Sequence, residues 1–153
     1  VIEWIEHTAI GTAIRESTWL FPAIEAGHLL ALALMGGAVL IVDLRMMGWG
    51  LQRMPASRIS RDVHPWLVAS LLGLIATGVL LFMSEATKCY FNPAFWVKMG
   101  FLVAGVLYTF TVRQRMALAG GADVDPSRAR LVAAVSVFLW SGVGIAGRAI
   151  GFY

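Results

Sequence analysis

The stretch WLFPAIEAGHLLALALMGGAVLIV, residues 19–42, is apolar throughout except for Glu25 and His28. It exceeds the roughly 20 residues that a helix needs to cross about 30 Å of hydrocarbon. Its apolar residues are continuous rather than alternating, and a backbone in lipid must satisfy its own hydrogen bonds, which argues against a membrane strand. The stretch therefore predicts a transmembrane helix.

Three further segments have the same character: Trp66 to Met83, Phe95 to Val112 and Leu131 to Ile150. Hydrophobic residues make up 59% of the chain and charged residues only 14%, a composition that excludes a soluble domain of this length. We predict an all-α, integral-membrane four-helix bundle. It forms a single domain, residues 1–153, with spans at about 19–45, 63–84, 94–115 and 127–150.

The segment from Val1 to Glu16 carries a broken apolar face that includes Ile2 and Ile5, with Glu3 and Glu6 among its polar residues. No basic segment followed by an apolar core is present, so a signal peptide is not expected. The pattern favours a short interfacial helix that lies flat on the outer surface of the membrane.

Helix boundary signals occur near the starts of spans two and four. Pro65 is predicted to occupy the first turn of span two, just after His64. Asp125 followed by Pro126 predicts an N-cap and first-turn pair for span four.

Basic residues predict the orientation of the spans. Of the 12 basic residues, Arg45, Arg53, Arg58 and Arg61 follow span one, and Arg113, Arg115, Arg128 and Arg130 follow span three. The positive-inside rule assigns these connections to the cytoplasm, which leaves both termini on the periplasmic side of a bacterial inner membrane. Arginines so placed hold topology and contact anionic lipid, so membrane lipid rather than nucleic acid is the expected partner.

Four ionisable residues lie inside the apolar segments. At a rise of about 1.5 Å per residue, Glu25, Lys98 and Arg148 fall roughly 9 to 11 Å above the midplane, and His28 about 5 Å above it. Ionisable side chains at such depth normally face one another, a cavity or a ligand. We therefore predict a site in the outer half of the bilayer.

Two interpretations of this quartet remain open. In the first, Glu25 is neutralised by Lys98 or Arg148 in a closed salt-bridge network. In the second, two cations against one carboxylate leave a positive excess that holds an anionic or redox ligand. Haem propionates, a quinone oxygen and a lipid phosphate are the candidate groups.

Haem b in a four-helix bundle needs an axial ligand, room for the ring and cations for its propionates. His28 is the candidate iron ligand, nearby glycines give clearance, and Lys98 and Arg148 are the candidate cations. The Glu25–His28 spacing also matches the Glu-x-x-His motif of di-iron bundles, but one copy is too little for a di-metal centre.

A second axial ligand is harder to find. His64 begins span two and lies about 20 Å below His28, so the two cannot share one iron. Met99, at similar depth on span three, is the candidate sixth ligand. His7 folding down from the surface helix and a five-coordinate iron are the alternatives.

Two polar residues outside the quartet have simpler interpretations. Asp43 is predicted to pair with Arg45 or with loop arginines. Cys89, the single cysteine, lies in a predicted outer loop from Ser84 to Pro93 and cannot form an internal disulfide.

Four stretches, Ile24–Leu30, Val42–Arg45, Thr77–Phe82 and Asn92–Lys98, resemble a bacterial family of small four-span inner-membrane proteins of unassigned function. The resemblance covers most of the chain. More distantly, the architecture is similar to four-helix copper-resistance membrane proteins and to cytochrome b-type bundles. Cytochrome b bundles usually carry paired histidines at matching depth, which this sequence lacks.

These features predict a small subunit of a larger respiratory or photosynthetic membrane assembly rather than an independent enzyme. Its expected role is haem b-linked or quinone-linked electron transfer at His28, with other membrane subunits as partners. A non-catalytic packing or assembly subunit is the alternative. A carrier for copper or another small solute is a further alternative.

Overall fold

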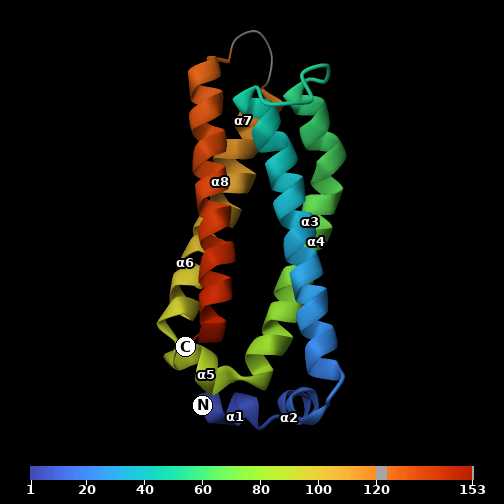
Figure 1. The fold of residues 1–153 in the computed structure, drawn as a ribbon, viewed down its shortest axis with the longest axis vertical. Coiled ribbons are helices and arrows are strands. Elements are labelled where there is room, and N and C mark those ends of the chain that lie inside the picture. The colour runs from blue at the N-terminus through green and yellow to red at the C-terminus, as the bar shows by residue number, and fades with distance from the viewer. Residues whose placement is uncertain (120–123, 153) are drawn as a thin grey trace.

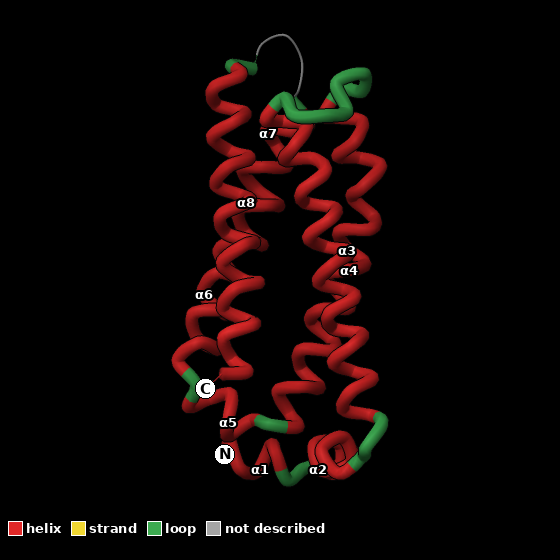
Figure 2. Tube along the Cα trace, in the orientation of Figure 1, coloured by secondary structure: helices red, strands yellow, loops and turns green. Residues whose placement is uncertain are grey.

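The computed structural model describes residues 1–119 and 124–152, and its architecture is a bundle of four helical rods (Figures 1 and 2). The rods are α3 (Leu20–Met47), α4 (Ala56–Ser84), α6 (Pro93–Tyr108) with its continuation, and α8 (Pro126–Ala149), which ends in the short η2 (Ile150–Phe152). The continuation of α6 is a π-helical turn, η1 (Thr109–Arg113), followed by α7 (Gln114–Leu118). All four rods are long and apolar enough to cross a membrane, which confirms the all-α prediction and indicates a multi-pass membrane protein.

The rods run alternately up and down the bundle and do not pack equally (Figure 1). α3 packs against both α4 and α8, and α8 packs against α6, whereas α4 and α6 make almost no backbone contact with each other. The backbone of α4 comes close to the third rod mainly at α7, where Ser60 Oγ donates a hydrogen bond to Gln114 Oε1 at 3.2 Å. The bundle is therefore closed at the α7 end and open between α4 and α6 toward the other end.

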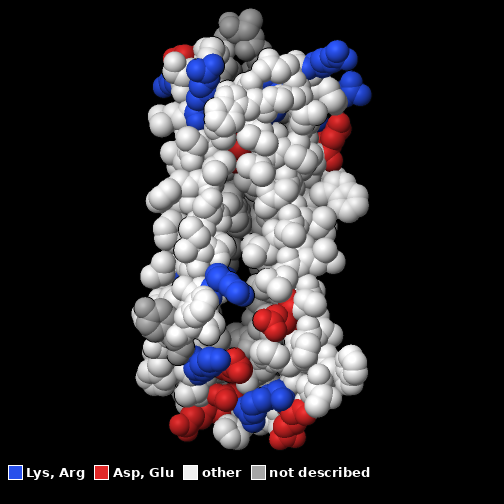
Figure 3. All heavy atoms as spheres, viewed as in Figure 1, with Lys and Arg blue, Asp and Glu red and all other residues white. Residues whose placement is uncertain are grey.

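The core follows the α3 axis. Met35, Val39, Leu74 and Val143 form its middle layer together with Trp140, which is 8% exposed. Trp140 Nε1 donates to Thr109 Oγ1 at 3.0 Å, so the polar edge of this mid-span indole is satisfied inside the bundle. On the face shown in Figure 3, charged side chains gather toward the two ends and leave an almost uncharged band between them, as a membrane span requires.

The start of α8 matches its sequence signal, whereas the start of α4 does not. Asp125 accepts a hydrogen bond from Ser127 N at 3.0 Å and Pro126 opens α8, which confirms the predicted cap. Pro65, however, lies inside α4, which begins at Ala56, so the first-turn prediction was wrong. The hydropathy pattern marks only the apolar part of α4, and the preceding polar residues extend the same helix.

The N-terminal segment forms two short helices across one end of the bundle, α1 (Ile2–Glu6) and α2 (Ala9–Glu16) (Figure 1). The sequence predicted one helix. The break lies at Thr8, whose extended backbone and side-chain hydrogen bond from Gly11 N, at 3.3 Å, cap the start of α2. A Cβ on Gly11 would lie 2.6 Å from Met83 O, so this glycine lets α2 approach the end of α4.

The connection after α4, predicted to be a loop, contains the short helix α5 (Ala86–Phe91). Glu6 ties α1 to it: its Oε2 accepts from Thr87 Oγ1 at 2.5 Å and from Thr87 N at 3.1 Å. The second carboxylate oxygen of Glu6 accepts from Arg15 at 2.9 Å. α1, α2 and α5 together therefore cover the open end of the bundle.

Candidate functional site

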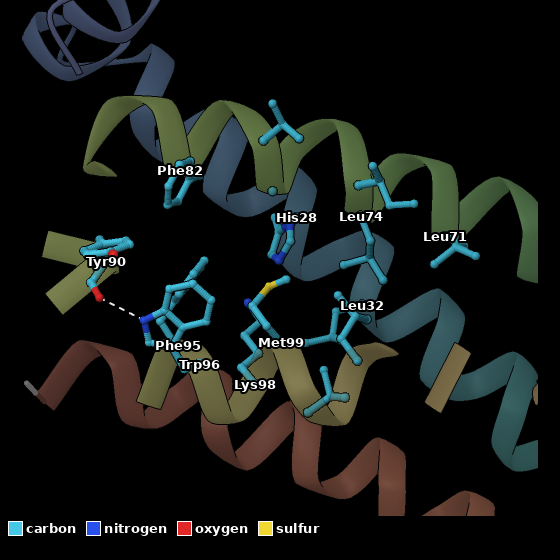
Figure 4. A pocket seen from close by; sticks show the side chains of 15 residues that line it. His28, Leu32, Leu71, Leu74, Phe82, Tyr90, Phe95, Trp96, Lys98 and Met99 are labelled. Carbon is cyan, nitrogen blue, oxygen red and sulfur yellow. Dashed lines mark hydrogen bonds between the residues drawn. The ribbon is translucent and has the colours of Figure 1, made fainter. Parts of the chain in front are cut away.

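A cavity of about 360 Å³ lies between α3, α4 and α6 in the half of the bundle covered by α1, α2 and α5 (Figure 4). Its floor is buried: Leu74 is 7% exposed and Val143 2%. Apart from glycine, almost all of the remaining lining is apolar or aromatic: Leu32, Leu71, Ile75, Val79, Phe82, Tyr90, Phe95, Trp96, Met99 and Leu102. Among the described residues, His28 and Lys98 are the lining side chains that carry an imidazole and an ammonium group, and Tyr90 adds a phenol at the α5 end.

His28 projects from α3 and is held against α4. Its Nδ1 lies 2.8 Å from Thr77 Oγ1. A Cβ on Gly78 would lie 3.4 Å from His28 Cε1, so the glycine after Thr77 gives the imidazole its place beside the α4 backbone. The Nδ1–Cε1 edge of the ring thus faces α4, and the ring projects into the cavity (Figure 4).

Lys98 and Met99 reach the cavity from α6. The Lys98 side chain lies along α8, with its Cε 3.6 Å from where a Cβ of Gly147 would stand. Within residues 1–119 and 124–152 no carboxylate forms a salt bridge with Lys98. Figure 4 shows His28 and Met99 projecting toward one another from opposite walls of the cavity.

Aromatic side chains form the end of the cavity nearest α5. Phe82 and Phe95 stack with centroids 5.6 Å apart and an interplanar angle of 23°. Trp96 Nε1 donates to Tyr90 O at 2.9 Å, shown dashed in Figure 4, and this bond attaches α5 to α6. These two contacts connect α4, α5 and α6 at this end of the cavity.

The structure brings three of the five predicted site residues together at the cavity: His28, Lys98 and Met99. Glu25 and Arg148 are exposed and do not line it. Arg148 instead places its guanidinium carbon 5.8 Å from the centroid of the Phe152 ring. In the described part of the chain no salt bridge joins Glu25 to either cation, so the closed network of the first interpretation does not form.

A second polar cluster lies nearer the α7 end, where the sequence predicted only an ion pair at a span end. Arg113 Nε donates to Asp43 Oδ1 at 2.6 Å and Arg113 Nη2 donates to Val39 O at 2.8 Å. Both charged side chains are buried, and Arg113 is part of a continuous helix, not of the connection to which its sequence position assigned it. Asp43 does pair with an arginine, as predicted, whereas Arg45 bonds to Met54 O.

Sequence reasoning missed two residues, Thr77 and Arg113. Thr77 is a hydroxyl residue next to a glycine in an otherwise apolar stretch, and that combination was the available signal. Arg113 was assigned to a connection because the apolar stretch of span three ends close to it. The π-helical turn at Thr109–Arg113, a feature frequent at functional sites, has no recognisable sequence signal.

Two groups at the covered end have shifted pKa values. The hydroxyl and the backbone N–H of Thr87 donate to Glu6 and lower the pKa of its carboxyl group. Burial, reinforced by the nearby Glu85 carboxylate, raises the pKa of the half-buried, free Cys89 thiol.

Comparison with known proteins gives a family and nothing more specific. No curated protein and no solved structure matches the chain. The profile of a family of unknown function, DUF6644, matches residues 1–153. This extent agrees with the resemblance of most of the chain to a family of small four-span proteins. The chain belongs to the DUF6644 family.

Proposed function

We propose that this protein binds a quinone-type ligand in the cavity beside His28 and Lys98, as an electron-transfer subunit of a larger membrane assembly. The supporting observation is the cavity itself. It is apolar, it lies between rods that are apolar enough to cross a membrane, and it presents one imidazole and one ammonium group to the same space.

The mouth of the cavity supports a ligand that arrives through the bilayer. Ile75 and Val79 on α4 are 52% and 53% exposed, and Trp96 on α6 is 54% exposed, although all three line the cavity. These residues mark the gap where α4 and α6 diverge. In a membrane this gap faces acyl chains, so the ligand would be lipophilic and a tail attached to its ring would extend into lipid.

The size and lining of the cavity suit one substituted ring. A volume of about 360 Å³ lies near the lower limit of the roughly 300 to 1,000 Å³ typical of small-molecule sites. Phe82 and Phe95 offer a stacking surface. His28, Lys98 and, at the α5 end, Tyr90 are the groups available to hydrogen-bond ring oxygens, and a few polar groups in an apolar pocket are the usual means of orienting a ligand.

Haem b is the second candidate, favoured by the hydrogen bond between His28 Nδ1 and Thr77, because metal-binding histidines commonly use the second ring nitrogen in this way. Met99 faces His28 and would be the candidate for a second iron ligand, and a haem would give the site one-electron chemistry. Its propionates would find only Lys98 at the cavity, since Arg148 lies elsewhere. The cavity therefore offers candidate ligands for a haem iron but only one cation for the propionates.

The remaining parts of the proposal follow from the arginine pattern and the exposed apolar faces. The connections at the α7 end would face the cytoplasm of a bacterial inner membrane, with α1, α2, α5 and the cavity toward the periplasm. The outer faces of the rods would contact lipid and partner subunits. An assembly subunit without a ligand is the competing function.

Binding of a short-chain prenylated quinone, in either redox form, to the protein in nanodiscs tests the proposal. His28→Leu and Lys98→Met each remove a hydrogen-bonding group from the cavity and should weaken binding of at least one form about tenfold. Glu25→Gln and Arg148→Met change ionisable residues on the same spans outside the cavity and should leave binding unchanged.

Absence of binding to the wild-type protein, or equal loss in the control variants, would reject the quinone proposal. An absorption spectrum of the purified protein, oxidised and reduced, tests the haem candidate, which requires haem bands that disappear in His28→Leu. If the protein only supports assembly, His28→Ala will leave the cofactor content of the isolated assembly unchanged.

A further inference from the structure

We infer that the cavity selects the hydroxyl-bearing, reduced form of its ring ligand, a quinol or a similar lipophilic phenol, because Thr77 fixes His28 as a hydrogen-bond acceptor. This inference rests on the proposed function and specifies its substrate class.

The argument begins with the single hydroxyl hydrogen of Thr77. Thr77 Oγ1 donates to Gly73 O, one turn earlier in α4, at 2.6 Å. A threonine hydroxyl has one hydrogen, so toward any other group this oxygen can act only as an acceptor. We therefore assign the hydrogen of the 2.8 Å contact with Thr77 to His28 Nδ1.

The tautomer of His28 follows. A neutral imidazole carries one hydrogen, so with Nδ1 protonated the Nε2 atom has a free lone pair. The Nδ1 and Cε1 edge of the ring is the one that approaches α4, at 3.9 and 3.4 Å from the Cβ position of Gly78. Nε2, which is bonded to Cε1, lies more than 4 Å from that Cβ position, and Figure 4 shows the ring projecting into the cavity toward Met99.

Beside His28 the cavity thus presents an acceptor, His28 Nε2, and a donor, Lys98 Nζ, while the Tyr90 side chain lines the α5 end. A quinone ring carries only acceptor oxygens, so its carbonyl would meet the Nε2 lone pair without a hydrogen between them. A quinol hydroxyl donates to Nε2, and its other oxygen accepts from Lys98. Binding a quinone in the same position would require His28 to take a hydrogen on Nε2 and, if it stays neutral, to break its bond to Thr77.

One net hydrogen bond between neutral groups is worth about 0.5 to 1.5 kcal/mol, which corresponds to roughly a twofold to twelvefold difference in affinity. We expect the wild-type protein to bind the quinol form more tightly than the quinone by this factor. The same hydrogen bond would place the ring hydroxyl proton where His28 accepts it.

The test compares a short-chain prenylated quinol, kept under argon, with its quinone in nanodisc binding assays at a pH where His28 is neutral. Thr77→Val removes the acceptor for Nδ1–H and should abolish the preference. Thr77→Ser keeps the hydroxyl and should retain it. Thr111→Val is the matched control, because the Thr111 hydroxyl also bonds to the carbonyl four residues earlier, Leu107 O, but lies on an exposed surface.

Nitrogen-15 NMR of the three histidines gives a second readout that does not depend on ligand binding or on the Thr77→Val variant. It should show His28 as the Nδ1–H tautomer in the wild type. Equal affinity for the two forms, tighter quinone binding or an Nε2–H tautomer would overturn this inference while leaving the quinone site itself intact. If neither form binds the wild type, both proposals are wrong.

Discussion

Arg113 and Asp43 join the third helical rod to the first through a hydrogen-bonded ion pair, with Arg113 Nε 2.6 Å from Asp43 Oδ1 and side-chain exposures of 1% and 0%. The two residues are 70 positions apart in sequence. Because each charge is the main compensation for the other in a low-dielectric interior, neither residue can be removed alone without a large penalty.

Asp43→Ala and Arg113→Met should each lower the free energy of unfolding by about 3 to 5 kcal/mol, because each leaves an uncompensated buried charge. The double variant Asp43→Leu/Arg113→Met removes both charges and should recover most of the loss. Denaturant titration in detergent micelles measures all three. Single variants as stable as the wild type would show that the pair does not hold the rods together.

A second prediction concerns the effect of a substitution at Gly11 on the free energy of unfolding. Gly11→Ala would place a Cβ 2.6 Å from Met83 O and 2.8 Å from Glu6 O, both of them backbone atoms that cannot rotate away. We expect a loss of about 1 to 3 kcal/mol from this overpacking, with displacement of α2 from the end of α4. Gly144→Ala is the matched control, since no atom lies within 4 Å of its Cβ position, and it should leave the melting temperature nearly unchanged.

Glu6 gives the α1–α5 contact a pH dependence. Its pKa in the folded protein is lowered from the ordinary value of 4.5, mainly by the hydrogen bond from the Thr87 hydroxyl. The contribution of this carboxylate to stability is therefore complete above the unfolded pKa and is lost as the pH falls through the lower folded pKa. In Glu6→Gln, the acid limb of a melting temperature against pH curve should be shallower; an unchanged limb would contradict the assignment.

Cys89 should react slowly with thiol reagents at neutral pH. Burial raises its pKa, so little thiolate is present and the sulfur is only partly accessible. We expect maleimide labelling several-fold slower than in the SDS-denatured protein, with a rate that rises with pH. Labelling as fast as in the denatured chain would show that α5 does not shield this residue.

Much of the fold was predictable because the bilayer imposes a length and a composition on each span. The four apolar segments gave the four rods, and Asp125 with Pro126 gave the start of α8. The break at Thr8 and the helix Ala86–Phe91 were not predicted. The break rests on a local cap by Thr8 that was not recognised in the sequence, whereas the short helix depends on tertiary contacts. Gly11 approaches α4 at that break, and Thr87 of the short helix is bound by Glu6.

The sequence predicts how far along each span the candidate site residues lie, but not which way their side chains point around the helix axes. A rise per residue places His28, Lys98 and Glu25 in one layer, but it does not show which way each side chain points. His28 and Lys98 face the cavity, and Glu25 lies on the exposed face of α3. Helix packing decides this, and Arg113 shows the same effect, since it enters the interior from a position where charge alone predicted a connection.

The opening between α4 and α6 determines how affinity for this cavity should be expressed. A ligand that enters from acyl chains is in equilibrium with the molecules dissolved in the lipid, whose concentration follows from partitioning and not from the amount added to the buffer. Apparent dissociation constants in aqueous units will therefore rise in proportion to the lipid or detergent present. Only the mole fraction of ligand in the bilayer gives a constant that two laboratories can compare.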